Sequence, residues 1–436
     1  MDRSTRKRFY NLCDPAEALA PGDERYADVD AFGARGSSWT DEVARSIELS
    51  DRPAYELVTA PTGAGLTTEL LRVGARLREH AGLLTVHIAA NTVLDLWSPI
   101  DSTDLLLAIV ERTERAVADE AGKPRPSEPL RRFRKWIAIP EIVAPEIESS
   151  SAVPSIGIME VLRDVPQARA KVRRRIDADR SRFLAEVRDE LTLLAHEARR
   201  LGRKGIAVLF DGLEKLGAIT SELSLVLDSA ERAFRTDLAP MSLPVHVVYA
   251  LPFALQLRLE SPVRVLAAIA LFDREGRRWE AGFQAAREIV ERRVPVPVLN
   301  ETFGPDKRSA CVDMLIASSG GTPRQLVRLL QSAIAESALD ETTFARLLAM
   351  DTDWLRRGIP ERAAAWLAEV HLRKALGPIE VTERHVAESM LVRGAVMPYR
   401  TGEAWVDVHP AVLRAPAVLA ALDRLLDSSR ASARTA

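Results

Sequence analysis

The strongest constraint on the fold is an apolar run that passes through a glycine-containing turn into an amphipathic helical pattern. The run is Tyr55–Ala60, the turn is PTGAG at residues 61–65, and the helical pattern covers residues 67–82. Further apolar runs alternate with helical patterns downstream, at Leu83–Ala90, up to Asp211, and at Val245–Pro252. This alternation predicts a parallel sheet of at least four strands covered by helices.

Length and composition predict several domains and no membrane anchor. At 436 residues the chain exceeds the size at which single hydrophobic cores stop growing. Hydrophobic residues make up 47% and charged residues 28%, with no apolar run that could span a bilayer and no secretory signal. We therefore expect a cytoplasmic protein. Its two cysteines, Cys13 and Cys311, support neither a disulfide framework nor a zinc site.

Changes of pattern along the chain divide it into four predicted parts. After the last helices, two alternating runs flank Thr401-Gly402-Glu403, and helices followed by such a hairpin suggest a winged helix. The predicted parts are an N-terminal arm at 1–38, an α/β core at 39–255 with a proline-rich insertion at about 123–160 and a long helix at about 163–204, a helical lid at 256–350, and a winged-helix domain at 351–436.

The turn after the first predicted strand has the form of a phosphate-binding loop that lacks its cation. In the frame GxxxxGK[ST], backbone N–H groups wrap a phosphate, the lysine neutralises its charge and the Ser/Thr holds Mg²⁺. Here Ala60 replaces the first glycine and Leu66 replaces the lysine. Losing that cation removes a charge-assisted bond of roughly 1.5–3 kcal/mol. An ordinary strand-to-helix turn built on Gly63 and Gly65 is the alternative.

Two acids and an arginine extend this pattern. Asp211 ends an apolar strand, at the edge where parallel sheets collect ligands, and Glu214 follows it closely. In phosphate-loop folds one such acid orders Mg²⁺ and a second polarises the attacking water. Arg324 begins a predicted helix in the segment Ser318–Leu330. The alternatives are a turn acid for Asp211, since Asp-Gly is a common turn pair, and a solvated helix-start arginine.

In this order the three motifs resemble those of bacterial AAA+ and STAND-type regulatory ATPases, close to the origin-recognition branch. Members of that group carry a strand ending in D-G-L-D/E-K/R, matched here by DGLEK at residues 211–215. They also carry a lid helix opening with G-x-P-R, matched by residues 321–324, and the segment at residues 393–410 is similar to the wing of their winged helix. The resemblance covers roughly residues 30–350 and the tail.

The resemblance implies an α/β P-loop NTPase fold with a helical lid and a C-terminal winged helix. It implies ATP or ADP with Mg²⁺ as the cofactor, Thr67 and Asp211 at the metal, and Asp211 and Glu214 as catalytic acids. Arg324 would sense the γ-phosphate, Tyr249 is the candidate for a polar sensor, and Ala34–Gly36 would pack near the nucleotide base. The residues that would line the nucleotide are Thr62, Gly63, Ala64, Gly65, Leu66, Thr67, Thr68 and Arg324.

Two charged regions bear on nucleic-acid binding. Residues 163–204 hold 13 basic and 7 acidic residues, which fits solvated helix faces, phosphate binding or an arginine offered to a neighbouring subunit. From Glu361 onward 10 basic residues face 9 acidic ones, too small an excess to supply many phosphate contacts. The winged helix is therefore predicted to pack or to bind protein, and DNA binding is not favoured.

The sequence thus predicts a nucleotide-responsive regulatory switch or scaffold that assembles with other protein subunits and not with a membrane. Because Leu66 replaces the lysine, ATP hydrolysis is expected to be weak or lost, as in a pseudo-ATPase. The resemblance alone suggests a role in bacterial defence or signalling. One alternative is a DNA-binding ATPase of the loader or initiator type, which would use the winged helix and residues 163–204. Another is an active ATPase that takes a cation from Lys215 or from a neighbouring subunit.

Overall fold

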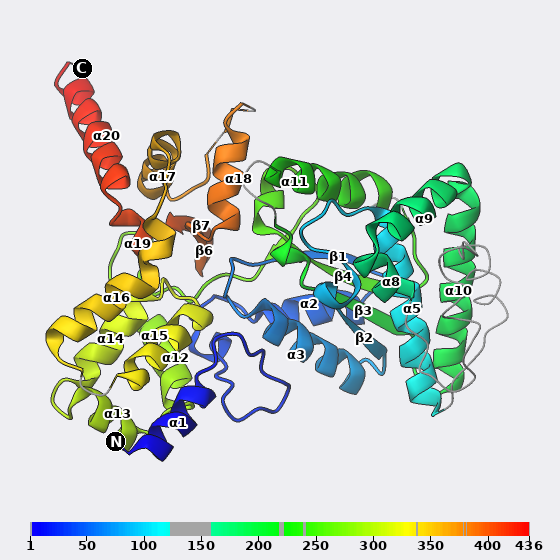
Figure 1. Cartoon of the computed structure of the whole chain (residues 1–436), viewed down its shortest axis with the longest axis horizontal. Helices are drawn as coiled ribbons and strands as arrows, with labels where there is room; N and C mark the ends of the chain where they lie inside the picture. Colours follow the sequence, from blue (N-terminus) through cyan, green and yellow to red (C-terminus); the bar gives the residue numbers. More distant parts are fainter. Residues whose placement is uncertain are drawn as a thin grey trace. The chain divides into compact units, whose positions relative to one another are not determined.

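The chain folds into two compact units, each assembled from segments that are far apart in the sequence. The predicted insertion at 123–160 lies outside the described residues, except for the start of one helix. The structure, a computed structural model (Figure 1), describes residues 2–122, 158–217, 222–238, 241–336, 339–377, 379–380 and 382–435. Unit 1 consists of Met1–Glu42, Thr59–Glu69 and Val265–Ala436, and unit 2 of Val43–Val58 and Leu70–Arg264.

A five-stranded sheet in the order β2-β3-β4-β1-β5 forms the α/β part. Strands β2, β3 and β4 pair in parallel, with Ala89 opposite Asp211 and Phe210 opposite Tyr249. Every residue of β3 is buried, which explains its continuous apolar run. The strands are β1 (Tyr55–Thr59), β2 (Leu84–Ala89), β3 (Ile206–Asp211), β4 (His246–Leu251) and β5 (Arg264–Val265). The four strands expected from the sequence are confirmed, and the two-residue β5 was missed because it is too short to show a pattern.

Unit 2 also contains the helices that lie between the strands in the sequence. Asp101 caps α5 by accepting from the Thr103 N–H, and Gly122 ends it with a left-handed backbone. Helix α10 packs along α5 (Figure 1). The elements are α4 (Ala90–Val93), α5 (Ser102–Ala121), α8 (Ile158–Asp164), α9 (Pro166–Ala178), α10 (Arg180–Arg200), the turn η2 (Leu213–Lys215), α11 (Leu223–Glu231), the π-helical η3 (Arg232–Leu238) and η4 (Phe253–Leu257).

The long helix expected at about 163–204 is in fact three helices, α8, α9 and α10. Pro166 stands at the first turn of α9, where its missing N–H costs nothing. The same residue could not continue a preceding helix, because it has no N–H to donate. Asp179 leaves helical backbone geometry and accepts from the Arg182 N–H, so that it caps α10. The apolar spacing could not reveal these breaks because it continues on both sides of each of them.

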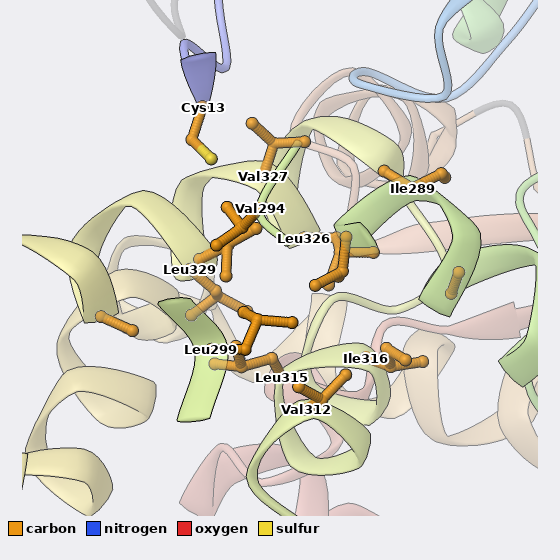
Figure 2. Close-up of a cluster of buried hydrophobic side chains, with 14 of the residues drawn as sticks. Cys13, Ile289, Val294, Leu299, Val312, Leu315, Ile316, Leu326, Val327 and Leu329 are labelled. Carbon is orange, nitrogen blue, oxygen red and sulfur yellow. The ribbon is translucent and has the colours of Figure 1, made fainter. Parts of the chain in front are cut away.

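Unit 1 contains the helical lid and, packed into it, the N-terminal segment. Helix α1 contacts α15, and the wholly buried Cys13 joins the core formed by residues such as Val294, Leu326 and Leu329 (Figure 2). The predicted arm is therefore part of the lid core, and burial raises the pKa of the Cys13 thiol to about 12. The elements are α1 (Arg3–Leu12), η1 (Asp30–Phe32), α12 (Glu280–Glu291), α13 (Val296–Phe303), α14 (Arg308–Ser318), α15 (Pro323–Ala335) and α16 (Glu341–Arg356).

The tail of unit 1 forms helices around an antiparallel hairpin. Strands β6 and β7 pair with Tyr399 opposite Trp405, and Gly402 with φ +95° makes the turn. The elements are α17 (Glu361–Arg373), α18 (Arg384–Val392), β6 (Val396–Thr401), β7 (Glu403–Val408), α19 (Pro410–Leu413) and α20 (Pro416–Thr435). The predicted fold class, a parallel α/β sheet with a helical lid and a C-terminal winged helix, is confirmed. The four-part division of the chain stays a prediction.

Two helices, α2 (Trp39–Glu48) and α3 (Leu66–Glu79), run across the boundaries of the two units. Within the part of the chain that the structure describes, no helix is both long and apolar enough to cross a membrane.

Candidate nucleotide site

The turn between β1 and α3 keeps the backbone geometry of a phosphate loop. Gly63 and Gly65 have φ +89° and +96°, which residues with a Cβ rarely adopt. The Glu69 N–H donates to the Gly65 carbonyl at 3.1 Å, so that α3 begins directly at the turn. A helix of this length presents free N–H groups and the positive end of its dipole at that point. The geometry suits an anion.

The position of the missing lysine is occupied by a core residue. Leu66 is only 5% exposed and Ala60 3%, so both pack into the protein. Thr62 is exposed, Ala64 is buried, and Thr67 is half-buried. The loop therefore has the shape of a phosphate site without a cation on residue 66.

A buried ion pair lies against this loop. The Arg35 guanidinium donates through Nη2 to the Ala64 carbonyl at 2.9 Å, and its Nη1 lies 3.5 Å from Oε1 of Glu69. Thr40 Oγ1 and the Tyr26 hydroxyl also donate to the Glu69 carboxylate, at 3.0 and 3.3 Å. Arg35 and Glu69 are each 4% exposed, and charges buried this deeply require such partners. The expected placement of Ala34–Gly36 beside the base stays a prediction, whereas Arg35 contacts the loop backbone.

Glu69 was missed by sequence reasoning. The signal available was an acid in the first turn of an otherwise apolar helical pattern, a place where acids are common for dipole reasons alone. Only the partners from residues 26–40 distinguish Glu69 from such an acid.

The lid arginine reaches the loop. The Arg324 backbone N–H donates to the Gly63 carbonyl at 3.2 Å, and its Nε donates to the Pro15 carbonyl at 3.2 Å. A Cβ added at Gly63 would lie 3.0 Å from the Arg324 Cβ, so the two backbones touch. Thr68 Oγ1 accepts from the Leu19 N–H at 3.2 Å. Unit 1 thus brings together the loop, Arg324 and the N-terminal segment.

Asp211 and Glu214 form a second group, in unit 2. Asp211 ends β3 at 2% exposure, with its Oδ2 3.3 Å from Nε2 of His87 on the neighbouring strand β2. Burial, and then the charge of Asp211, raise the pKa of the Glu214 carboxyl. Glu214 Oε2 is buried and has no hydrogen-bond partner among the described residues, while Oε1 lies 3.8 Å from the half-exposed Lys215. Buried acids with raised pKa values are typical of functional sites.

His87 was also missed, although a histidine inside the apolar run LTVHIA was a visible signal. Within the described residues, no three histidine, cysteine or carboxylate side chains form a group that could hold a metal ion.

The sensor role expected for Tyr249 is wrong. Its side chain is wholly buried, with ring centroids 5.6, 6.0 and 5.3 Å from those of Tyr55, Phe210 and Phe234. Burial raises the pKa of its phenol well above the usual value. Tyr249 is a core residue because its position on β4 faces this aromatic cluster and not the solvent.

Part of the basic stretch at 163–204 is used inside unit 2. Arg169 and Arg173 both donate to the buried Asp104 carboxylate of α5. Arg180 lies 3.3 Å from Asp237. Other basic residues of the stretch are exposed, among them Arg174, Arg175, Arg188, Arg199 and Arg200.

The sheet order, the phosphate-type loop after β1, the lid and the winged helix together make a P-loop fold of the AAA+ type, as the motifs predicted. No model of a protein family matches the chain, and no curated protein matches it.

Solved structures to which the chain is similar include the ORC2 protein of Aeropyrum pernix in its ADP form, with 11% identity, 96% of this chain and 98% of that chain covered, and a TM-score of 0.38. The same protein in ADPNP–ADP complexes gives 12% identity, coverage of 90% and 94%, and a TM-score of 0.34. Cdc6p from Pyrobaculum aerophilum has 11% identity, with 95% of this chain and 98% of that chain covered, and a TM-score of 0.34. The fold is defined by this chain's own elements, and likenesses of this size add nothing to it.

Proposed function

We propose that this protein is a nucleotide-responsive regulatory switch or scaffold that binds ATP or ADP with Mg²⁺ weakly and hydrolyses ATP slowly or not at all. The observation that carries this proposal is the loop. It keeps two glycines with positive φ and its contact with Arg324, yet Leu66 packs into the core where a phosphate-binding lysine belongs. A loop of this shape can hold a phosphate through N–H groups alone, at reduced affinity.

The roles of the individual residues are part of the proposal. Backbone groups of residues 62–68 would wrap the phosphates, and Thr67 and Asp211 would order Mg²⁺. Glu214, with its raised pKa, suits accepting a proton from water, and Arg324 would respond to the γ-phosphate. Without a lysine, transition-state charge has one stabilising group fewer, and turnover should be slow.

We propose other protein subunits as partners, in the cytoplasm, and a place in bacterial defence or signalling stays a prediction. Met397, Tyr399 and Trp405 of the wing are at most 8% exposed, so these side chains pack within the chain and offer no surface to DNA. A DNA-binding loader or initiator ATPase is the alternative. A DNA affinity that falls steeply with salt concentration would support that alternative.

The first test is unfolding of the full chain with and without millimolar Mg·ATP and Mg·ADP. A ligand at 100 times its dissociation constant stabilises the native state by about 2.7 kcal/mol and raises the unfolding temperature. We expect a shift that is lost in Asp211→Ala and in Thr67→Ala. Thr302→Ala is the matched control, since it removes a half-buried threonine hydroxyl that bonds only its own helix. Absence of any shift in the wild type would contradict nucleotide binding and leave a scaffold.

A further inference from the structure

The wing of the winged helix is bonded to the turn that precedes the lid arginine. The Tyr399 hydroxyl on β6 donates to the Gly320 carbonyl at 2.9 Å, in a buried position. One residue earlier, the Pro398 carbonyl accepts from the Ala268 N–H at 2.9 Å. Tyr399 stacks on Trp405 with ring centroids 4.7 Å apart, so its hydroxyl is aimed at Gly320 by a rigid pair of rings.

The next residue of β6 reaches the segment that carries Arg35. Arg400 lies over Gly36, where an added Cβ would be 3.0 Å from the Arg400 Cδ. Its Nη1 lies 3.2 Å from Oε1 of Glu42 in α2. Consecutive residues of one strand therefore contact the turn before the lid helix and the segment that bonds the loop carbonyl.

The turn at Gly320 and Gly321 has no room for side chains. Both glycines have positive φ, at +61° and +79°. A Cβ at Gly320 would lie 2.6 Å from the His409 ring, and one at Gly321 would lie 1.9 Å from the Ile269 carbonyl oxygen. The Ile269 N–H also donates to the Gly321 carbonyl at 2.9 Å. The turn is thus enclosed by the winged helix on one side and by the 266–271 segment on the other.

This turn sets the start of α15 and therefore the position of Arg324. Thr322 is the N-cap, Pro323 is the first helical residue and Arg324 follows directly. The Arg324 N–H lies in the first turn of α15, where N–H groups bond outside the helix, and it donates to the Gly63 carbonyl of the phosphate-type loop at 3.2 Å. Because a helix is stiff, a displacement of the turn displaces Arg324 against the loop.

We propose that the β6–β7 wing is a positioning element for the lid arginine, in which the Tyr399 hydroxyl holds the Gly320–Gly321 turn and so keeps Arg324 against the loop. The ligand concerned is a nucleoside triphosphate, because only its γ-phosphate distinguishes it from the diphosphate at Arg324. The inference rests on the proposed function for the role of Arg324, and on the contacts of the structure alone for the role of Tyr399. A wing used in this way acts on a residue of its own chain.

The test is Tyr399→Phe, which removes one hydroxyl and keeps the stack on Trp405. Amide hydrogen exchange at residues 320–326, without nucleotide, should become about 3- to 10-fold faster, as expected for one lost hydrogen bond. The dissociation constant for ATP should rise by a similar factor while that for ADP stays nearly constant. The matched control is Tyr55→Phe, which removes a tyrosine bond to a backbone carbonyl, that of Phe234 at 3.1 Å, in unit 2.

Unchanged exchange at residues 320–326 in Tyr399→Phe would overturn the proposal, and so would equal losses of ATP and ADP affinity, which a purely structural role predicts. A wild-type chain that binds neither nucleotide would contradict the proposed function by itself. The exchange result would then still decide whether Tyr399 holds the turn.

Discussion

Restoring the missing lysine is the sharpest perturbation that the site allows. Leu66 is 5% exposed, and fully burying a leucine is worth about 1.5–3 kcal/mol. Leu66→Lys should therefore lower the free energy of unfolding without ligand by at least about that amount, because an unpaired buried charge adds its own cost. With nucleotide, a charge-assisted bond of about 1.5–3 kcal/mol should tighten binding roughly 10- to 150-fold. The variant should thus be less stable alone and bind ATP more tightly.

Two titrations measure these effects: chemical denaturation without ligand, and calorimetric titration with Mg·ATP at low salt. Leu66→Met is the matched control, because a volume-conserving swap costs less than about 1.5 kcal/mol and adds no charge. Leu66→Gln separates polarity from charge. If the lysine variant binds ATP no more tightly than the methionine variant, the loop does not hold a phosphate next to residue 66, and the reasoning on the loop is wrong.

Three further predictions concern unit 1. Gly63→Ala should lower the free energy of unfolding by about 2 kcal/mol more than Gly22→Ala in denaturant titrations. Both glycines have φ near +90°, but only Gly63 faces a neighbouring side chain, at 3.0 Å. Equal losses would show that the contact with the lid is not tightly packed. Arg35→Met should lower the free energy of unfolding by about 3 kcal/mol, because Glu69 stays buried without the Arg35 cation. In a double-mutant cycle, adding Glu69→Gln should recover most of this loss. Simple additivity of the two changes would contradict the pairing. Burial lowers the pKa of His409 to about 4, so the folded state binds a proton less readily than the unfolded one, and stability is lost as pH falls. Relative to His409→Gln, the wild type should lose about 2 kcal/mol between about pH 7.5 and pH 5, starting from an unfolded pKa of about 6.5; parallel pH profiles would exclude a buried neutral His409.

Local patterns were enough to predict the α/β part. Strands such as β3 are buried on both faces, so their apolar runs are continuous and visible in the sequence. The glycine that ends α5 was equally visible, because a terminal glycine is a local signal. The two-residue β5 and the break at Asp179 were not, since neither interrupts the apolar spacing.

The residues of the candidate site were only partly accessible. The glycine turn, Asp211 and Arg324 belong to short motifs, and their positions along the chain could be read directly, whereas their roles stay predictions. Tyr249 shows the limit of such reading, because the end of a strand does not reveal which way a side chain faces. His87 was missed because its partner Asp211 lies on another strand.

The sequence by itself determined the succession of strands, turn and helices along the chain, and the absence of a lysine at residue 66. Periodicity and motif spacing are patterns over a few residues, so they are visible without the tertiary structure. Only the tertiary structure decided what surrounds the loop. Arg35 meets Glu69 across 34 residues and Tyr399 meets Gly320 across 79. Contacts between segments so far apart depend on how helices and strands pack as whole elements, and no local pattern encodes them.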